Sequence, residues 1–92
     1  MPIERVRISP LVRGSISNDG LVLLDVQGGL VFASNIVGAR IWRLIEEHGE
    51  TCAIARAIAA EFDVDLARAT RDVDAFVTAL CARGIVSPER PC

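Results

Sequence analysis

The pattern of apolar and polar residues predicts strands in the first third of the chain. Residues 12–16 (VRGSI) alternate in character, as a half-exposed strand does, and residues 30–34 (LVFAS) form another strand-like run. Between them, residues 21–26 (LVLLDV) are nearly continuous β-formers, which is typical of a strand that is covered on both faces or central in its sheet. Turns are expected at 17–20 (SNDG) and 27–29 (QGG), because Asn, Asp and Gly tolerate a positive φ. These features predict a three-stranded antiparallel meander.

After this segment, apolar residues recur at the spacing of an α-helix. Asn35 is a favourable N-cap for a first helix, which we expect to end at Gly49. Thr51 is the expected N-cap of a second helix. Asp65 is the expected N-cap of a third helix that runs over about 66–83. The chain therefore changes once from a period of two to a period of 3.6 residues.

The element order β-β-β-α-α-α predicts an α+β fold. We expect a winged-helix-like architecture, in which a three-stranded antiparallel sheet is followed by a three-helix bundle. The predicted domain covers residues 12–86, after an irregular lead-in at 1–11 and before a tail at 87–92. Two aromatic side chains, Trp42 and Phe76, are expected to be at least partly buried.

Composition narrows the classes of protein to which the chain can belong. A chain of 92 residues forms one small domain with little room for a deep enzyme cleft. Its net charge of −2 disfavours nucleic acid as a partner, because such domains carry a basic excess. No apolar run approaches the roughly 20 residues of a membrane span, and the first ten residues lack the apolar centre of a signal peptide. We therefore expect a cytoplasmic protein without membrane contacts.

The sequence offers few residues for catalysis or metal binding. The one histidine, His48, falls near the end of the first predicted helix and is interpreted as a helix-end residue. None of the three cysteines is close in sequence to another, as a zinc or redox motif requires. Asp72 and Asp74 are two positions apart on a helix and so point in different directions. We expect no enzyme activity, no catalytic residue, no metal site and no cofactor.

A binding surface is expected at an edge of the sheet. Neither the first nor the third predicted strand contains a Pro or Lys that would block its edge. An available edge beside a helix face of small residues suits the addition of a strand from another chain. This argument leaves the edges of both the first and the third strand available.

Two segments carry a resemblance to a known family. LLDVQGGLVFASNIVGARIW (23–42) closely resembles the PqqD-like family, and AAEFDVD with RDVDAFVTALCARGIV (59–65 and 71–86) resembles the end of that family's pattern. The resemblance covers about residues 12–86. The chain departs from the pattern at Val31 and Phe32, where the family often has two aromatic residues, and at Ser34, where it often has Leu.

The resemblance implies a function. PqqD-like domains recognise the leader segment of precursor peptides that are made on the ribosome and then modified. They bind the leader as an extra strand along the third strand, in the groove between that strand and the third helix, and present the peptide to a modifying enzyme such as a radical-SAM enzyme, a protease or a cyclase. The implied partners are thus a leader peptide and such an enzyme. On this resemblance the candidate peptide-binding residues are Leu30, Val31, Phe32, Ala33 and Ser34 of the third strand with Asp72, Ala75, Phe76 and Ala79 of the third helix. Because strand side chains alternate, we expect Val31 and Ala33 to line the groove beside this helix. Neither the precursor nor the oligomeric state follows from the sequence.

The alternative is a winged-helix DNA-binding regulator that places its third helix in a major groove. That helix contains Arg68, Arg71 and Arg83, but also two aspartates, Asp72 and Asp74. A recognition helix collects its basic residues on the groove face, and the net charge of −2 also disfavours this alternative.

Overall fold

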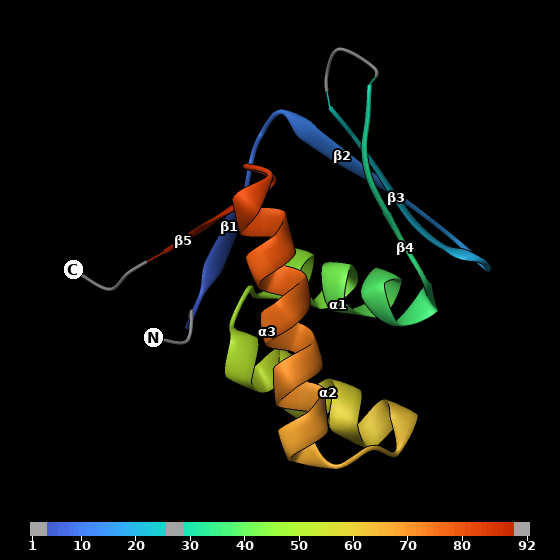
Figure 1. The fold of residues 1–92 in the computed structure, drawn as a ribbon, viewed down its shortest axis with the longest axis vertical. Coiled ribbons are helices and arrows are strands. Elements are labelled where there is room, and N and C mark those ends of the chain that lie inside the picture. The colour runs from blue at the N-terminus through green and yellow to red at the C-terminus, as the bar shows by residue number, and fades with distance from the viewer. Residues whose placement is uncertain (1–3, 26–28, 90–92) are drawn as a thin grey trace.

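The computed structural model describes residues 4–25 and 29–89 (Figure 1). Two small sheets and three helices make up the fold, and each element forms a continuous stretch of the chain. In chain order they are β1 (Val6–Ile8), β2 (Val12–Ser17), β3 (Gly20–Asp25), β4 (Leu30–Ser34), α1 (Ile36–Glu47), α2 (Thr51–Phe62), α3 (Leu66–Ala82) and β5 (Val86–Pro88). The predicted α+β fold, with a three-stranded antiparallel sheet before three helices, is confirmed.

The three-stranded sheet has the order β2-β3-β4, so β3 is central, as predicted. Only one face of β3 is covered, however. Leu21 and Leu23 are 1% and 0% exposed, whereas Val22 between them is 39% exposed. Of the two alternatives, the central position is therefore correct and cover on both faces is not, because the helices pack on one side of this sheet, as Figure 1 shows.

Two of the three predicted N-caps are confirmed. The Asn35 side chain accepts a hydrogen bond from the backbone N–H of Gly38 at 3.0 Å, and Asp65 accepts one from Ala67 at 3.3 Å. These bonds satisfy N–H groups that have no partner within the first turn of a helix. At its other end α3 is followed by Gly84, which adopts a φ of +73° as expected for a residue after a helix.

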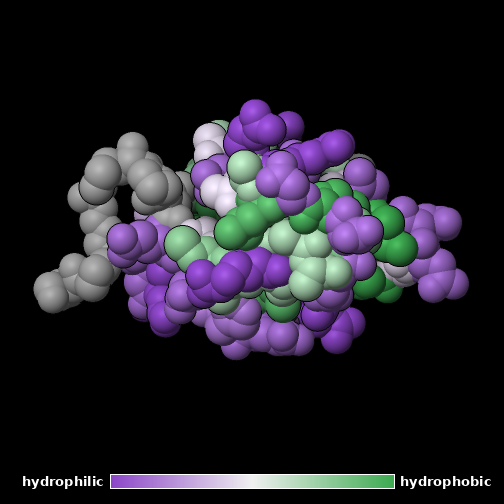
Figure 2. Space-filling model, turned by 90° about the horizontal axis from the view of Figure 1, so that it is seen from below, coloured by the Kyte–Doolittle hydropathy of each residue, from purple (hydrophilic) through white to green (hydrophobic). Residues whose placement is uncertain are grey.

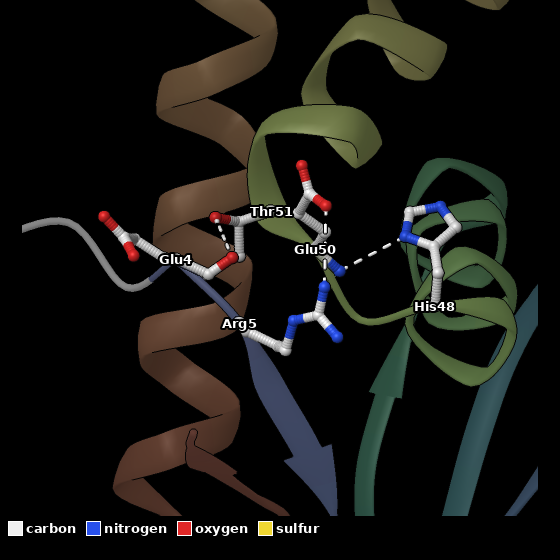
Figure 3. Close-up of polar contacts among 5 residues, drawn as sticks. All are labelled: Glu4, Arg5, His48, Glu50 and Thr51. Carbon is white, nitrogen blue, oxygen red and sulfur yellow. Dashed lines mark hydrogen bonds and ion pairs between the residues drawn. The ribbon is translucent and has the colours of Figure 1, made fainter. Parts of the chain in front are cut away.

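Thr51 is not an N-cap, because the N-terminal segment of the chain lies against the start of α2. The N-cap position belongs to Glu50, and the Thr51 hydroxyl donates instead to the Glu4 carbonyl at 3.2 Å (Figure 3). Arg5 forms a bridge with Glu50 through the backbone and an ion pair at 3.6 Å through the side chains. Contacts between residues almost fifty positions apart in the sequence thus take the place of the predicted Thr51 cap. Such contacts cannot be inferred from the local sequence.

The predicted irregular lead-in contains a strand. β1 pairs antiparallel with β5 in a separate two-stranded sheet, in which Val6 lies opposite Pro88. The Val6 side chain is 4% exposed, so this segment contributes to the core. Ile85 and Val86 are also buried, so the chain returns to the core after the third helix.

The core is centred on Trp42, which is 1% exposed. Helix α1 packs against β3 on one side and α2 on the other, and α2 packs against α3. Gly14 of β2 lies directly over the indole: a Cβ there would be 3.0 Å from Trp42 Cε2. Phe76 is half-buried. The predicted burial of Trp42 and Phe76 is thus confirmed.

Within residues 4–25 and 29–89, the longest helix is α3 with 17 residues. None of the helices in this described part has the length and apolar character required to cross a membrane.

Candidate functional site

The candidate site begins with β4, which is an edge strand. β4 pairs with β3 along one side, and no other strand in the described part of the chain pairs with its second side. The register shifts within β4: Leu23 lies opposite Phe32, but Leu24 lies opposite Leu30, which leaves Val31 as an extra residue. Such a β-bulge interrupts the regular ladder and increases the local twist. The backbone groups of the regular part, from Phe32 onward, are therefore the ones best placed to pair with a further strand.

Phe32 is the β4 side chain that faces α3. Its ring meets that of Phe76 edge-to-face, with centroids 5.7 Å apart and planes at 81°. Phe32 lies opposite Leu23, whose side chain is fully buried, which places both on the helix side of the sheet. An aromatic pair in this geometry contributes attraction beyond the area that it buries. β4 and α3 are thus connected through two half-buried rings.

The predicted orientation of Ala33 is wrong. Ala33 is exposed and lies opposite Val22 on the outer face of the sheet, away from the side that Phe32 occupies. Alternation predicts two faces but not which one turns inward. Phe32 has far more apolar surface to bury than Ala33, and this favours the observed orientation. The side chains of Leu30 and Val31 lie outside the described part of the structure.

The candidate residues of α3 form an open face. Ala75 is exposed, Ala79 and Phe76 are half-buried, and Asp72 is exposed. The Asp72 carboxylate is 4.0 Å from the guanidinium of Arg68, one turn earlier. A pair this exposed contributes little to stability. The structure therefore brings Phe32 of β4 together with Phe76 of α3, and the small side chains of Ala75 and Ala79 flank Phe76 along that helix.

Arg83 belongs to this site and was not included among the candidate peptide-binding residues. Its guanidinium carbon lies 5.5 Å from the centroid of the Phe32 ring, at a cation–π distance. Arg83 follows Phe76 by two helical turns and therefore continues the same side of α3 as its C-cap residue. The two-turn spacing from Phe76 was the signal in the sequence that could have identified Arg83 as part of the site. In the sequence analysis Arg83 appears only as a potential DNA contact.

Gly38 is a second residue that sequence reasoning missed. A Cβ on Gly38 would lie 2.7 Å from Ser34 Cβ and 2.9 Å from Phe76 Cε1. β4, α1 and α3 thus meet at a point where only glycine fits without a shift of its neighbours. The signal was a glycine inside a helical pattern, which costs about 1 kcal/mol relative to alanine and so usually has a packing reason.

We expect Gly38→Ala to lower the free energy of unfolding by about 1–3 kcal/mol, because overpacking at this junction outweighs the gain of about 1 kcal/mol in helix propensity. Urea denaturation followed by circular dichroism measures the change. Gly29→Ala is the control, since the atoms nearest to a Cβ there are those of the Asp25 carboxylate, at 3.6 Å or more. An increase in stability for Gly38→Ala, as propensity alone would produce, would contradict this description of the junction.

His48 and the cysteines are the other candidates for catalysis or metal binding. His48 is the exposed C-cap of α1, and its Nδ1 accepts a hydrogen bond from the Glu50 backbone N–H at 3.2 Å (Figure 3). Cys52 is exposed. Cys81 is half-buried, and burial raises the pKa of its thiol. Cys92 lies outside the described residues. In the described ranges, no three His, Cys, Asp or Glu side chains are grouped in a way that could hold a metal ion.

An edge strand beside an open helix face of small and aromatic residues is the arrangement of a module that binds an extended peptide by strand addition. The sequence family described as coenzyme PQQ synthesis protein D (PqqD) matches residues 20–86, and the chain belongs to this family. The resemblance inferred from the sequence motifs is thus confirmed.

Two solved structures are similar over almost their whole length. The structure described as TbiB1 in complex with the TbiA(beta) leader peptide is 35% identical, covers 92% of this chain and 99% of its own, and superimposes with a TM-score of 0.80. Lasso peptide synthetase B1 complexed with the leader peptide is 30% identical, covers 91% and 99%, and gives a TM-score of 0.74. None of the curated proteins matches the sequence significantly.

Proposed function

We propose that this protein binds the leader segment of a ribosomally made precursor peptide and delivers it to a modifying enzyme. The observation that carries the proposal is the free edge of β4 beside the Phe32–Phe76 pair. Membership of the PqqD family and similarity to two structures solved with leader peptides support it.

The geometry suggests how affinity and selectivity arise. A leader strand along β4 gains main-chain hydrogen bonds, which have little sequence preference. Selectivity then comes from side chains beside that strand: Phe32 and Phe76 offer an apolar wall, and Asp72 offers a carboxylate for a basic leader residue. Ala75 and Ala79 leave room for the peptide backbone. The bulge at Val31 restricts regular pairing to the segment that ends at Ser34.

The same proposal assigns chemistry to a partner rather than to this chain. We propose a cytoplasmic, non-catalytic module without metal or cofactor, whose partner is a radical-SAM enzyme, a protease or a cyclase. The alternative of a DNA-binding regulator has no support in the family match or in the two similar structures. The net charge of −2 also disfavours that alternative.

Ala75→Arg and Ala79→Arg are expected to weaken leader binding by roughly tenfold or more, because the long side chain occupies the space of the added strand. Isothermal titration of the cognate precursor leader against the purified protein measures the dissociation constants. Ala60→Arg on α2 is the matched control, since Ala60 is exposed and distant in sequence from the site. Equal dissociation constants for the wild type and both α3 variants would remove this face from consideration.

A further inference from the structure

A depression lies between α1 and the end of β2. Ile36, Ala39, Arg40 and Arg43 follow one another at helical spacing and form one stripe of α1. Together with the end of β2 they enclose a depression of about 480 Å³, to which we refer as the α1–β2 groove. The β2 residues that line it are Ile16 and Ser17, followed by Asn18 of the turn.

The α1–β2 groove is separate from the candidate leader site. β2 and β4 are the two opposite edges of the three-stranded sheet, with β3 between them. None of the residues that line the groove is among the candidate leader-binding residues. A strand added along β4 would therefore leave the groove accessible.

The groove exposes two large aliphatic side chains. Ile16 lies opposite the buried Leu21 and so is on the helix side of the sheet, yet it remains 40% exposed because α1 covers it only in part. Ile36, in the first turn of α1, is 55% exposed. Neighbouring exposed aliphatic side chains beside charged ones are typical of surfaces that contact another protein.

The charge of the groove selects the chemistry of its occupant. None of its lining residues is acidic, and two are arginines. Arg40 Nε donates to Glu61 at 2.8 Å, and this bond raises the pKa of Arg40, with a smaller contribution from Glu47. Arg43 is exposed and forms no ion pair with any residue in the described part of the chain. Because Glu61 offsets the charge of Arg40, Arg43 is the arginine that remains to pair with an occupant. Beside Ile16 and Ile36 it suits a segment that carries a carboxylate next to an aliphatic side chain.

We propose that the α1–β2 groove binds the enzyme that modifies the peptide, through an acidic and aliphatic segment of that enzyme. The inference rests on the proposed function: a protein that delivers a peptide must contact the enzyme while the peptide is bound, so the enzyme requires a surface away from β4 and α3.

A second copy of this chain is a less suitable occupant. The turn between α2 and α3 is itself apolar and acidic, since Phe62 and Leu66 are exposed beside Asp63 and Asp65. Figure 2 views the molecule from the side of that turn and shows hydrophobic surface bordered by hydrophilic residues. Insertion of this turn into the α1–β2 groove of another copy would join two different surfaces, and such head-to-tail contacts give open chains unless their rotation closes a ring.

The test measures binding of the purified cognate modifying enzyme, encoded beside the precursor, to the full chain saturated with leader peptide. Arg43→Glu and Ile36→Ser are each expected to weaken enzyme binding by roughly tenfold or more. Arg56→Glu is the control for a charge reversal at an exposed arginine outside the groove, and should change the affinity by less than about twofold. All three variants should bind the leader alone with the affinity of the wild type.

The outcomes separate this inference from the proposed function. If the leader binds but Arg43→Glu and Ile36→Ser keep the wild-type affinity for the enzyme, or if the enzyme does not bind the wild-type complex, the inference is overturned and leader binding stands. If the wild type self-associates in sedimentation and Arg43→Glu abolishes only that association, the groove binds a second copy and the inference is again overturned. Failure of the wild type to bind the leader would instead contradict the proposed function.

Discussion

Replacing Leu80 by alanine is expected to lower the free energy of unfolding by about 2–5 kcal/mol. Leu80 is 0% exposed and lies on the buried face of α3 together with Val73 and Val77. Truncation removes apolar contacts and leaves a cavity that the surrounding helices fill only in part. For a domain of this size the loss is a large fraction of the total stability, which is typically about 5–15 kcal/mol.

Urea denaturation of wild type and variant, followed by circular dichroism, measures this loss. Leu66→Ala is a closely matched control, because it makes the same chemical change on the same helix at a residue that is 50% exposed. We expect its effect to be below about 1 kcal/mol. Equal shifts of the two denaturation midpoints would mean that the buried face of α3 has been assigned wrongly.

Trp42→Ala is expected to be at least as damaging, with a loss of about 3–5 kcal/mol. Trp42 has the largest of the fully buried side chains and lies beneath Gly14 of β2. It fills the space between α1 and the sheet, so its removal leaves a cavity that a backbone held by strand pairing cannot close. Since Trp42 is the only tryptophan, circular dichroism rather than intrinsic fluorescence is the suitable measurement.

Trp42→Phe separates the contribution of the ring from that of its N–H group. The indole Nε1 is buried and has no hydrogen-bond partner among the described residues. A buried donor without a partner is unfavourable by about 1–3 kcal/mol, so its removal partly offsets the loss of volume. We therefore expect Trp42→Phe to be clearly less destabilising than Trp42→Ala. Equal losses for the two variants would contradict this expectation.

The element order followed from local signals in the sequence. The change from strand-like runs to helical spacing places three strands before three helices, and the structure has them in that order. Asn35 and Asp65 cap their helices, and Gly84 follows the third, because these effects depend on hydrogen bonds and φ angles within a few residues. The family motifs at 23–42 and 71–86 were recognisable for the same reason: they record local spacing.

Contacts between distant residues could not be predicted in this way. β1 exists because Val6 pairs with Pro88, at the other end of the chain, and neither segment has a strand pattern long enough to be noticed alone. The same N-terminal segment supplies the Glu4 carbonyl to Thr51 and so displaced the predicted N-cap.

The candidate site also combines features that the local sequence predicted with features that depend on contacts between distant residues. The sequence by itself determined that a strand edge and a helix face with Ala75, Phe76 and Ala79 exist, since both follow from local periodicity. Only the tertiary structure decided that Phe32 rather than Ala33 faces α3, that Arg83 lies over the Phe32 ring, and that glycine is required at position 38. The physical reason is that periodicity fixes which side chains share a face, whereas the choice of the buried face depends on the apolar area and close packing available when separate elements meet.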